Sequence, residues 1–329
     1  MRNRRGAVGA VAMAVASGLL TLAGCGGGHS VPSAGPAPES AGASSPYPAT
    51  AERPGSDPST WTLPMLAYQP TQEQEKAIGQ AETKLVGDCM ARLGVAWQPA
   101  PDLPPVGPKN LLDRRYGIHD AALAATRGYQ PDADEVARHD GAMRAQSSAP
   151  KSSPDVEVYL GGTDLPPDLL AQADAETRNA AAPGGKIPPG GCFGEARRTL
   201  GSPTRGLTPL VDHLTYQSFP DSLQDPQVKA VFAQWSACMN AKGLRYRAPL
   251  DANDDPTFEP GAKGVTRQEI STALADLACR DRHHVAEVWH DAESRLQQQE
   301  IAANREALEA DRHTLDAVLA KTADVLARH

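Results

Sequence analysis

Cysteine is the residue type with the clearest chemistry in this sequence, and two of the five cysteines lie in a repeated pattern. The segments 89–97 and 238–246 both read Cys-Met, three residues, Gly, an aliphatic residue, any residue and an aromatic residue. Each follows apolar residues at helical spacing, which predicts a cysteine on the buried face of a helix near its end. We interpret the repeat as two related helical modules. Chance similarity between two helix ends is the alternative, because Cys-Met with a helix-ending glycine is a short motif.

The N-terminal residues indicate export and lipidation. Arginines within residues 1–5 precede an apolar run of small residues over 7–22, which is typical of a signal peptide and too short to favour a spanning helix. The run ends in Leu-Ala-Gly before Cys25, which resembles the lipobox of bacterial lipoproteins. The resemblance implies cleavage before Cys25 and a diacylglycerol on its sulfur, which would hold the chain stably on a membrane. An ordinary secretory signal cleaved elsewhere is the alternative.

The other four cysteines are expected to form two disulfides, because an even number of cysteines is typical of exported disulfide-bonded proteins. Beside Cys89 and Cys238 they are Cys192, after a Gly-rich turn, and Cys279, within a later helical pattern. Four cysteines allow three pairings. The repeat favours Cys89 with Cys192 and Cys238 with Cys279, so that each module closes on itself. Loop-closure entropy then predicts stabilisation of about 5 and about 4 kcal/mol.

Local signals predict a mainly α fold. Capping-box sequences begin at Thr71 and Thr266, and Asp225 precedes a proline at a first helical position. Gly94 and Gly243 stand where a helix-ending glycine belongs. Long runs of β-branched residues are absent from the sequence. The fold is therefore expected to consist of two small disulfide-pinned helical modules with a long helix or a helical hairpin at the C-terminus.

These patterns divide the chain into four predicted regions. A lipoprotein signal peptide covers residues 1–24, and a disordered tether rich in Gly, Pro and Ser covers 25–65. The first helical module covers 66–215 and the second covers 216–329. From residue 265 to the end there is no Gly or Pro, which allows either one long helix or two helices packed as a hairpin.

Several of these features together resemble a group of uncharacterised secreted lipoproteins of high-GC actinobacteria. The resemblance rests on the paired Cys-Met helices, the segments 114–117 (Arg-Arg-Tyr-Gly) and 128–129 (Gly-Tyr), the Gly-rich segment 189–196 and the charged terminal helix. It covers most of the chain after residue 65. The resemblance implies a helical architecture in the cell envelope. It transfers no catalytic residue, because the group has no established activity.

The charge balance limits the partners. Without residues 1–24 the chain keeps 29 basic and 40 acidic residues, a net charge of −11. Such a protein is repelled by anionic lipid and lacks the basic patch that nucleic acid requires. We therefore expect membrane contact through the lipid on Cys25, an envelope protein as partner, and no nucleic acid.

Patterns that could support catalysis or metal binding are weak. Residues 148–151 match Ser-x-x-Lys, but a proline interrupts the helix that the motif needs. Residues 251–255 begin like a calcium loop, but Pro256 stands where that loop needs glycine. His283 and His290 are seven residues apart and could bind a metal on one helix face, although such histidines are usually solvated. We expect no catalytic residue, metal or cofactor.

Three function classes remain. The first is a non-catalytic binding or adaptor lipoprotein of the cell envelope, for example an accessory of a transporter or of the wall machinery. The second is a ligand-capturing lipoprotein, which usually needs a two-lobed α/β fold with buried Val- and Ile-rich strands. The third is an enzyme that acts on the cell wall. The tether, the acidic surface, the repeat and the terminal helix favour the first class, and a mainly helical structure would favour it over the second.

Overall fold

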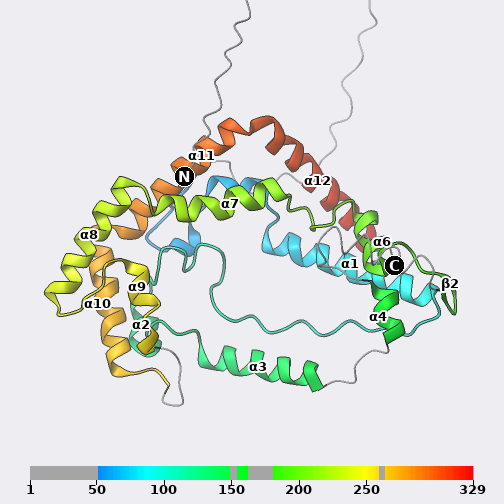
Figure 1. Ribbon diagram of the computed structural model, residues 1–329, viewed down its shortest axis with the longest axis horizontal. Helices are drawn as coiled ribbons and strands as arrows, with labels where there is room; N and C mark the ends of the chain where they lie inside the picture. The colour runs from blue at the N-terminus through cyan, green and yellow to red at the C-terminus, as the bar shows by residue number, and fades with distance from the viewer. Residues whose placement is uncertain (1–50, 149–153, 162–180, 259–263, 329) are drawn as a thin grey trace, which may run out of the picture. The chain divides into compact units, whose positions relative to one another are not determined.

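The computed structural model describes residues 51–148, 154–161, 181–258 and 264–328, and the signal peptide and Cys25 lie outside this part. The described residues form α-helices, 3-10 helices and one antiparallel hairpin of two very short strands (Figure 1). This confirms the predicted mainly α fold class. Among the described residues, no helix has the length and apolarity to cross a bilayer.

The described residues form the following elements in chain order. They are η1 (Pro58–Thr60), η2 (Pro64–Tyr68), α1 (Gln72–Arg92), α2 (Ala121–Arg127), α3 (Ala133–Ser148), α4 (Pro154–Leu160), β1 (Ala181–Ala182), β2 (Gly185–Lys186), α6 (Gly191–Leu200), α7 (Pro209–Ser222), α8 (Pro226–Ala241), α9 (Pro249–Asn253), η3 (Pro256–Phe258), α10 (Arg267–His283), α11 (Val285–Ala303) and α12 (Arg305–Ala327).

The predicted helix starts are observed. Thr71 caps α1 in a closed capping box with Gln74, and Asp225 caps α8 with a proline at the first position. Thr266 caps α10 by accepting a hydrogen bond from the backbone N–H of Glu269. The Glu269 carboxylate does not complete this box, because it accepts the backbone N–H of Tyr129 at 3.1 Å instead.

The predicted disulfide pairing is confirmed. Cys89 in α1 bonds to Cys192 in α6, with 5.6 Å between their Cα atoms. Cys238 in α8 bonds to Cys279 in α10, with 5.8 Å between their Cα atoms. Each disulfide therefore pins the end of a Cys-Met helix to a later helix.

Each disulfide lies in a cluster of buried side chains of its own. The first disulfide core is small and consists of Val86, Cys89, Met90, Leu93, Ala182, Ile187, Cys192 and Ala196. The second disulfide core is larger and contains, beside Cys238 and Cys279, several aromatic side chains: Trp61, Tyr116, Tyr129, Phe232, Trp235, Phe258 and Trp289. In a further cluster α12 packs along α1 through Ile78, Ala81, Leu315 and Val318.

Helical structure is present before residue 65, the predicted end of the tether. Residues 58–60 form η1, residues 64–68 form η2, and Trp61, Leu63 and Met65 are buried. The predicted boundary was wrong because it rested on the Gly, Pro and Ser content, whereas the alternating apolar side chains at 61, 63 and 65 are buried. In addition, α7 runs across the predicted module boundary between residues 215 and 216.

The C-terminal segment forms three helices in place of the one long helix or the hairpin that we expected. The break between α10 and α11 is at His284, whose φ of 53° places it in the left-handed region. The break between α11 and α12 is at Asn304, whose side chain donates to the Glu300 carbonyl. Helix α11 packs on α7 and α8, whereas α12 packs on α1 and α6 (Figure 1).

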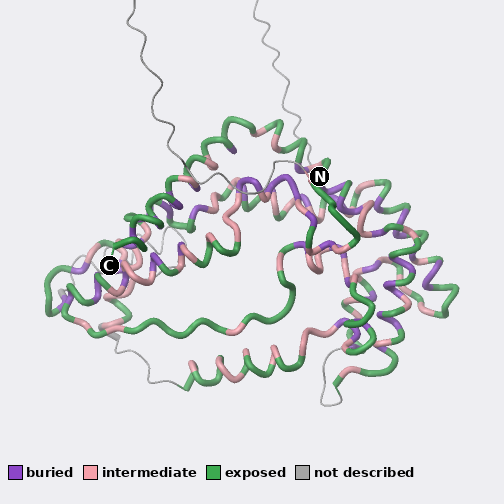
Figure 2. The backbone as a smooth tube through the Cα atoms, turned by 180° about the vertical axis from the view of Figure 1, so that it is seen from behind, coloured by how far each residue is buried: buried purple, intermediate pink, exposed green. Residues whose placement is uncertain are grey.

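Helix α3 differs from the other long helices because none of its residues is buried (Figure 2). It is connected to the preceding extended segment by two side-chain contacts. A ring nitrogen of His139 lies 2.8 Å from the Pro104 carbonyl, and the Gln146 amide donates to the Pro101 carbonyl at 2.6 Å.

Candidate functional site

A cavity of about 590 Å³ lies beside the second disulfide core and shares Ile118 and Ala124 with it. Its lining comes from the turn before η1, from the segment that leads into α2, from α2 itself and from the start of α3: Ser56, Asp57, Gly107, Lys109, Asp113, Arg114, Ile118, His119, Asp120, Ala121, Ala122, Leu123, Ala124, Arg127, Gly128 and Glu135. Many of these side chains are polar or charged, which makes the cavity a candidate site for binding or catalysis.

Hydrogen bonds of Asn110 and Asp120 hold the cavity walls together. The Asn110 amide donates to the Ser59 carbonyl at 2.7 Å, which joins the two wall segments. The Asn110 carbonyl oxygen accepts the N–H groups of Leu112 and Asp113, which forms the turn before Arg114. Asp120 caps α2 by accepting two backbone N–H groups. Local turns and one contact between distant segments therefore fix the backbone around the cavity.

His119 lies between two carboxylates. Its Nε2 is 2.8 Å from Asp113 Oδ1, and its Nδ1 is 3.5 Å from Asp57 Oδ1. The other oxygen of Asp113 accepts the Lys109 N–H at 2.7 Å. Hydrogen bonding from Ser59 lowers the pKa of Asp57. Burial raises the pKa of Asp113, but the Lys109 N–H and His119 outweigh burial and leave that pKa below its ordinary value. Both acids are therefore carboxylates at neutral pH.

The Asp113–His119 pair is the arrangement that orients a general base, but the rest of a nucleophilic site is not assembled. The second ring nitrogen of His119 faces the Asp57 carboxylate and not a hydroxyl or thiol. Ser56 also lines the cavity, but within the described part of the chain it makes no hydrogen bond with His119.

Two arginines complete the cavity. Arg114 donates from Nη2 to the Tyr129 carbonyl at 2.8 Å. Arg127 lies 3.9 Å from Asp132, the outer limit of an ion pair. Burial and the nearby charge of Arg127 lower the pKa of Arg114, which still leaves it a cation at neutral pH.

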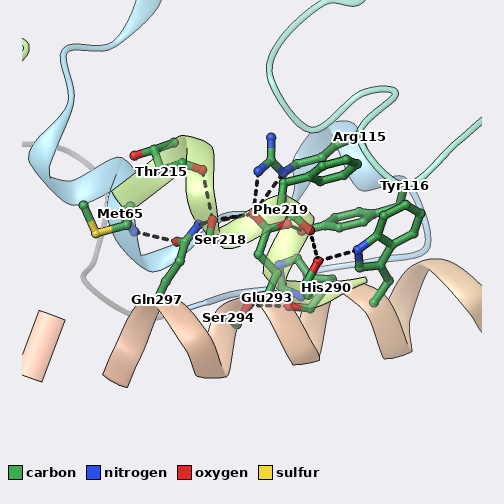
Figure 3. A network of polar contacts seen from close by, with 12 residues as sticks. Met65, Arg115, Tyr116, Thr215, Ser218, Phe219, His290, Glu293, Ser294 and Gln297 are labelled. Atoms are coloured by element: carbon green, nitrogen blue, oxygen red, sulfur yellow. Dashed lines mark hydrogen bonds and ion pairs between the residues drawn. The ribbon is translucent and has the colours of Figure 1, made fainter. Parts of the chain in front are cut away.

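The neighbouring Arg115 points into the protein and belongs to a buried polar network (Figure 3). Its guanidinium contacts both oxygens of the fully buried Glu293, which also accepts the Tyr116 hydroxyl and the Ser218 hydroxyl, each at 2.8 Å. Gln297 extends the network by accepting the Met65 N–H at 2.9 Å. The network therefore holds the segment of Arg115, η2, α7 and α11 together.

A second buried acid, Asp276, anchors the other side of the second disulfide core. It accepts hydrogen bonds from Trp235 Nε1 at 2.8 Å, from Arg280 Nε at 2.7 Å and from the Tyr129 hydroxyl at 3.1 Å. Arg280 also donates to the Tyr116 carbonyl at 2.5 Å. Gly117 has a φ of 105°, and a Cβ there would collide with the Arg280 guanidinium. Glycine is therefore required at this position.

The other weak motifs of the sequence are not brought together into a site. His283 and His290 lie in different helices, and the buried His290 contacts the Thr62 carbonyl through Nε2. Asp251 accepts the N–H groups of Arg247 and Ala248 within its own turn. Lys151 of the Ser-x-x-Lys match lies outside the described residues. Over the described ranges, no group of three or more His, Cys, Asp or Glu side chains is placed to hold a metal ion.

The cavity residues Asp57, Asp113 and His119 belong to no motif of the sequence. Asp57 is far from the other two along the chain, and no spacing rule joins it to His119. The one available signal was the segment 114–117, whose two arginines turn in opposite directions, Arg114 to the cavity and Arg115 to Glu293.

Comparison of the chain with models of protein families, with curated proteins and with solved structures finds no match in any of the three. Function is therefore inferred from the chain's own residues.

Proposed function

We propose that this chain is a membrane-anchored extracytoplasmic lipoprotein, held by lipid on Cys25, whose folded part has a non-catalytic binding or adaptor role in the cell envelope. The proposed partner is an envelope protein, such as a subunit of a transporter or of the wall machinery. The lipobox-like sequence before Cys25 and the signal-peptide pattern support the anchor.

The disulfides support the extracytoplasmic location. The sulfurs of both bonds lie in helical cores, and disulfides of this kind persist in oxidising compartments and are rare in a reducing cytosol. The mainly helical fold favours an adaptor over a two-lobed capture protein, because the described residues contain no parallel sheet.

The observation that supports a non-catalytic role is the state of the ionisable groups in the cavity. Asp57 and Asp113 are both occupied by His119 and by backbone N–H groups, and no hydroxyl or thiol of the described residues contacts His119. A pre-formed polar cavity without an activated nucleophile supports binding over nucleophilic catalysis.

The proposed location and role can be tested together in intact cells. Cross-linking followed by mass spectrometry of the tagged chain is expected to recover one envelope protein in stoichiometric amount. Cys25→Ala is expected to release the chain from the membrane fraction, with Ser30→Ala, a substitution close to Cys25 that keeps the cysteine, as the control. Unchanged membrane retention of Cys25→Ala would refute the anchor, and recovery of the chain alone would refute the protein partner.

An enzyme acting on the wall is the second candidate, and the Asp113–His119 pair is the observation that favours it. If His119 were a general base, His119→Ala would abolish release of fragments from purified cell-wall material. The binding role predicts no such release by either the wild-type protein or the variant.

A further inference from the structure

We propose that the cavity binds the anionic group of a small molecule, a carboxylate or a phosphate, through the guanidinium groups of Arg114 and Arg127. This inference rests on the proposed non-catalytic role of the cavity and adds a small-molecule ligand beside the proposed protein partner.

Several arginines of the folded part are paired with buried acids, and Arg114 differs from them. Arg115 pairs with Glu293, Arg280 with Asp276, and Arg197 and Arg205 share Glu82. Arg114 makes one hydrogen bond, to the Tyr129 carbonyl, and within the described ranges it makes no ion pair. A guanidinium carries five N–H donors, so most donors of Arg114 remain available.

The electrostatic surroundings of Arg114 favour an added anion. Burial and the like charges of Arg127 and Arg280 lower the pKa of Arg114, and they outweigh the opposite effect of the Asp113 charge. The nearest acid of Arg127, Asp132, is at 3.9 Å, so that guanidinium is also weakly neutralised. A partly buried cation beside another cation is costly, and because Asp113 offsets this cost only in part, a bound anion would add the missing counter-charge.

The acids that line the cavity do not fill this role, because most are already engaged. Both oxygens of Asp113 are occupied by His119 and the Lys109 N–H, and Asp120 caps α2. Asp57 accepts the Ser59 N–H and faces His119. Glu135 is the cavity acid whose carboxylate makes neither an ion pair nor a hydrogen bond in the described part of the chain. The negative charge of Glu135 repels an anion, so removing this charge should strengthen anion binding.

The size of the cavity points to a small molecule. Its volume of about 590 Å³ is typical of small-ligand pockets and too small for a folded partner. Carboxylates and phosphates both accept paired hydrogen bonds from arginine, so the two ligand classes share the same chemistry and must be separated by experiment.

The test is isothermal titration calorimetry of the purified full chain with two probes, inorganic phosphate and succinate. We expect saturable binding of at least one probe to the wild-type protein, and the probe that binds identifies the class. Arg114→Met and Arg127→Met should each weaken that binding by about tenfold or more, the effect of losing a charged hydrogen bond. Glu135→Gln should strengthen it. Arg295→Met is the matched control, because Arg295 pairs with Asp225 outside the cavity.

A readout without ligand separates a binding role of Arg114 from a structural one. If the role of Arg114 is to bind an anion, the Tm of the unliganded Arg114→Met protein should lie within about 2 °C of the wild-type Tm or above it. A much larger fall in Tm would make Arg114 a structural residue and overturn the proposal. So would absence of binding of both probes to the wild-type protein, or equal binding by Arg114→Met. These failures would leave the membrane anchor and the cross-linked partner untouched, so they are distinguishable from failure of the proposed function.

Discussion

Helices α1 and α8 carry the two Cys-Met pairs, and they end in the same way. Gly94 and Gly243 have φ of 78° and 83°. The next residue donates its N–H to the carbonyl of the methionine, Val95 to Met90 and Leu244 to Met239, both at 3.0 Å. The residue after the cysteine thus anchors the helix end through its backbone in both regions.

The surroundings of the two disulfides differ in how they hold charge. Near the first disulfide, Glu82 is 2% exposed, but one of its partners, Arg205, is 53% exposed. Near the second, Glu293 and its partner Arg115 are 0% and 11% exposed. The same helix-ending motif therefore occurs beside two different cores. The small core has an ion pair that is partly exposed to water, and the large core has an ion pair that is mostly buried. The repeat specifies the helix ends and the disulfides, and the packing around them is specified elsewhere.

The largest expected effect is loss of a disulfide. Replacing Cys89 and Cys192 by Ser should lower the free energy of unfolding by about 5 kcal/mol, and replacing Cys238 and Cys279 by about 4 kcal/mol, because the first bond closes the longer loop. Urea denaturation of the two double variants measures this order. A clearly larger loss for the second pair would show that packing in the larger core outweighs loop entropy.

The next largest difference in stability should come from replacing the buried acid near each disulfide. Glu293→Gln is expected to cost about 3–5 kcal/mol, because it leaves the buried charge of Arg115 without its partner. Glu82→Gln should cost less, about 1.5–3 kcal/mol, since Arg205 can turn to water. Chemical denaturation checks both.

The exposed Glu309 on α12 offers a control, and Glu309→Gln should change stability by less than about 0.5 kcal/mol. Equal losses for Glu293→Gln and Glu82→Gln would contradict the contrast drawn between the two regions.

The shared helix ends predict equal effects. Gly94→Ala and Gly243→Ala should each cost about 1–2 kcal/mol, because both positions require the left-handed conformation and neither has a close neighbour that a Cβ would strike. Thermal melting of the two variants gives the comparison. A difference well beyond about 1 kcal/mol between them would mean that the two ends are not equivalent.

The smallest effect concerns pH and the second region alone. Burial lowers the pKa of His290, so the folded protein keeps this side chain neutral when the unfolded chain already binds a proton. Its contribution to stability is present above the unfolded pKa of about 6.5 and is lost as pH falls through the lowered folded pKa. Between about pH 7.5 and 5, His290→Gln should lose about 1 kcal/mol less stability than the wild-type protein.

The exposed His213 on α7 supplies the control, because His213→Gln should keep the wild-type pH dependence. Parallel stability–pH curves for the wild-type protein and His290→Gln would contradict the assignment of a neutral buried histidine.

The features that could be predicted from the sequence are those set by a few neighbouring residues. The caps at Thr71 and Asp225, the glycines that end α1 and α8 and the mainly helical class were predicted because local hydrogen bonding determines them. The disulfide pairing followed from the repeat, since Cys89 and Cys238 lie at the same place in their helices.

The features that escaped prediction depend on distant contacts. Glu293 and Asp276 lie on charged helices and look like surface residues in sequence, and their burial depends on Arg115 and Arg280. The break at His284 has no Gly or Pro to announce it. The cavity needs Asp57 and His119 to meet across the chain, and this contact is visible only once Asn110 has joined the two segments.

The most direct test of the whole account is intact-mass analysis of the chain recovered from the membrane fraction, after alkylation of free thiols without reduction. The account predicts a mature chain that begins at Cys25, carries a diacylglycerol and takes up no alkylating reagent at Cys89, Cys192, Cys238 or Cys279. A chain found in the soluble fraction without lipid, or one whose four cysteines are alkylated, would contradict it.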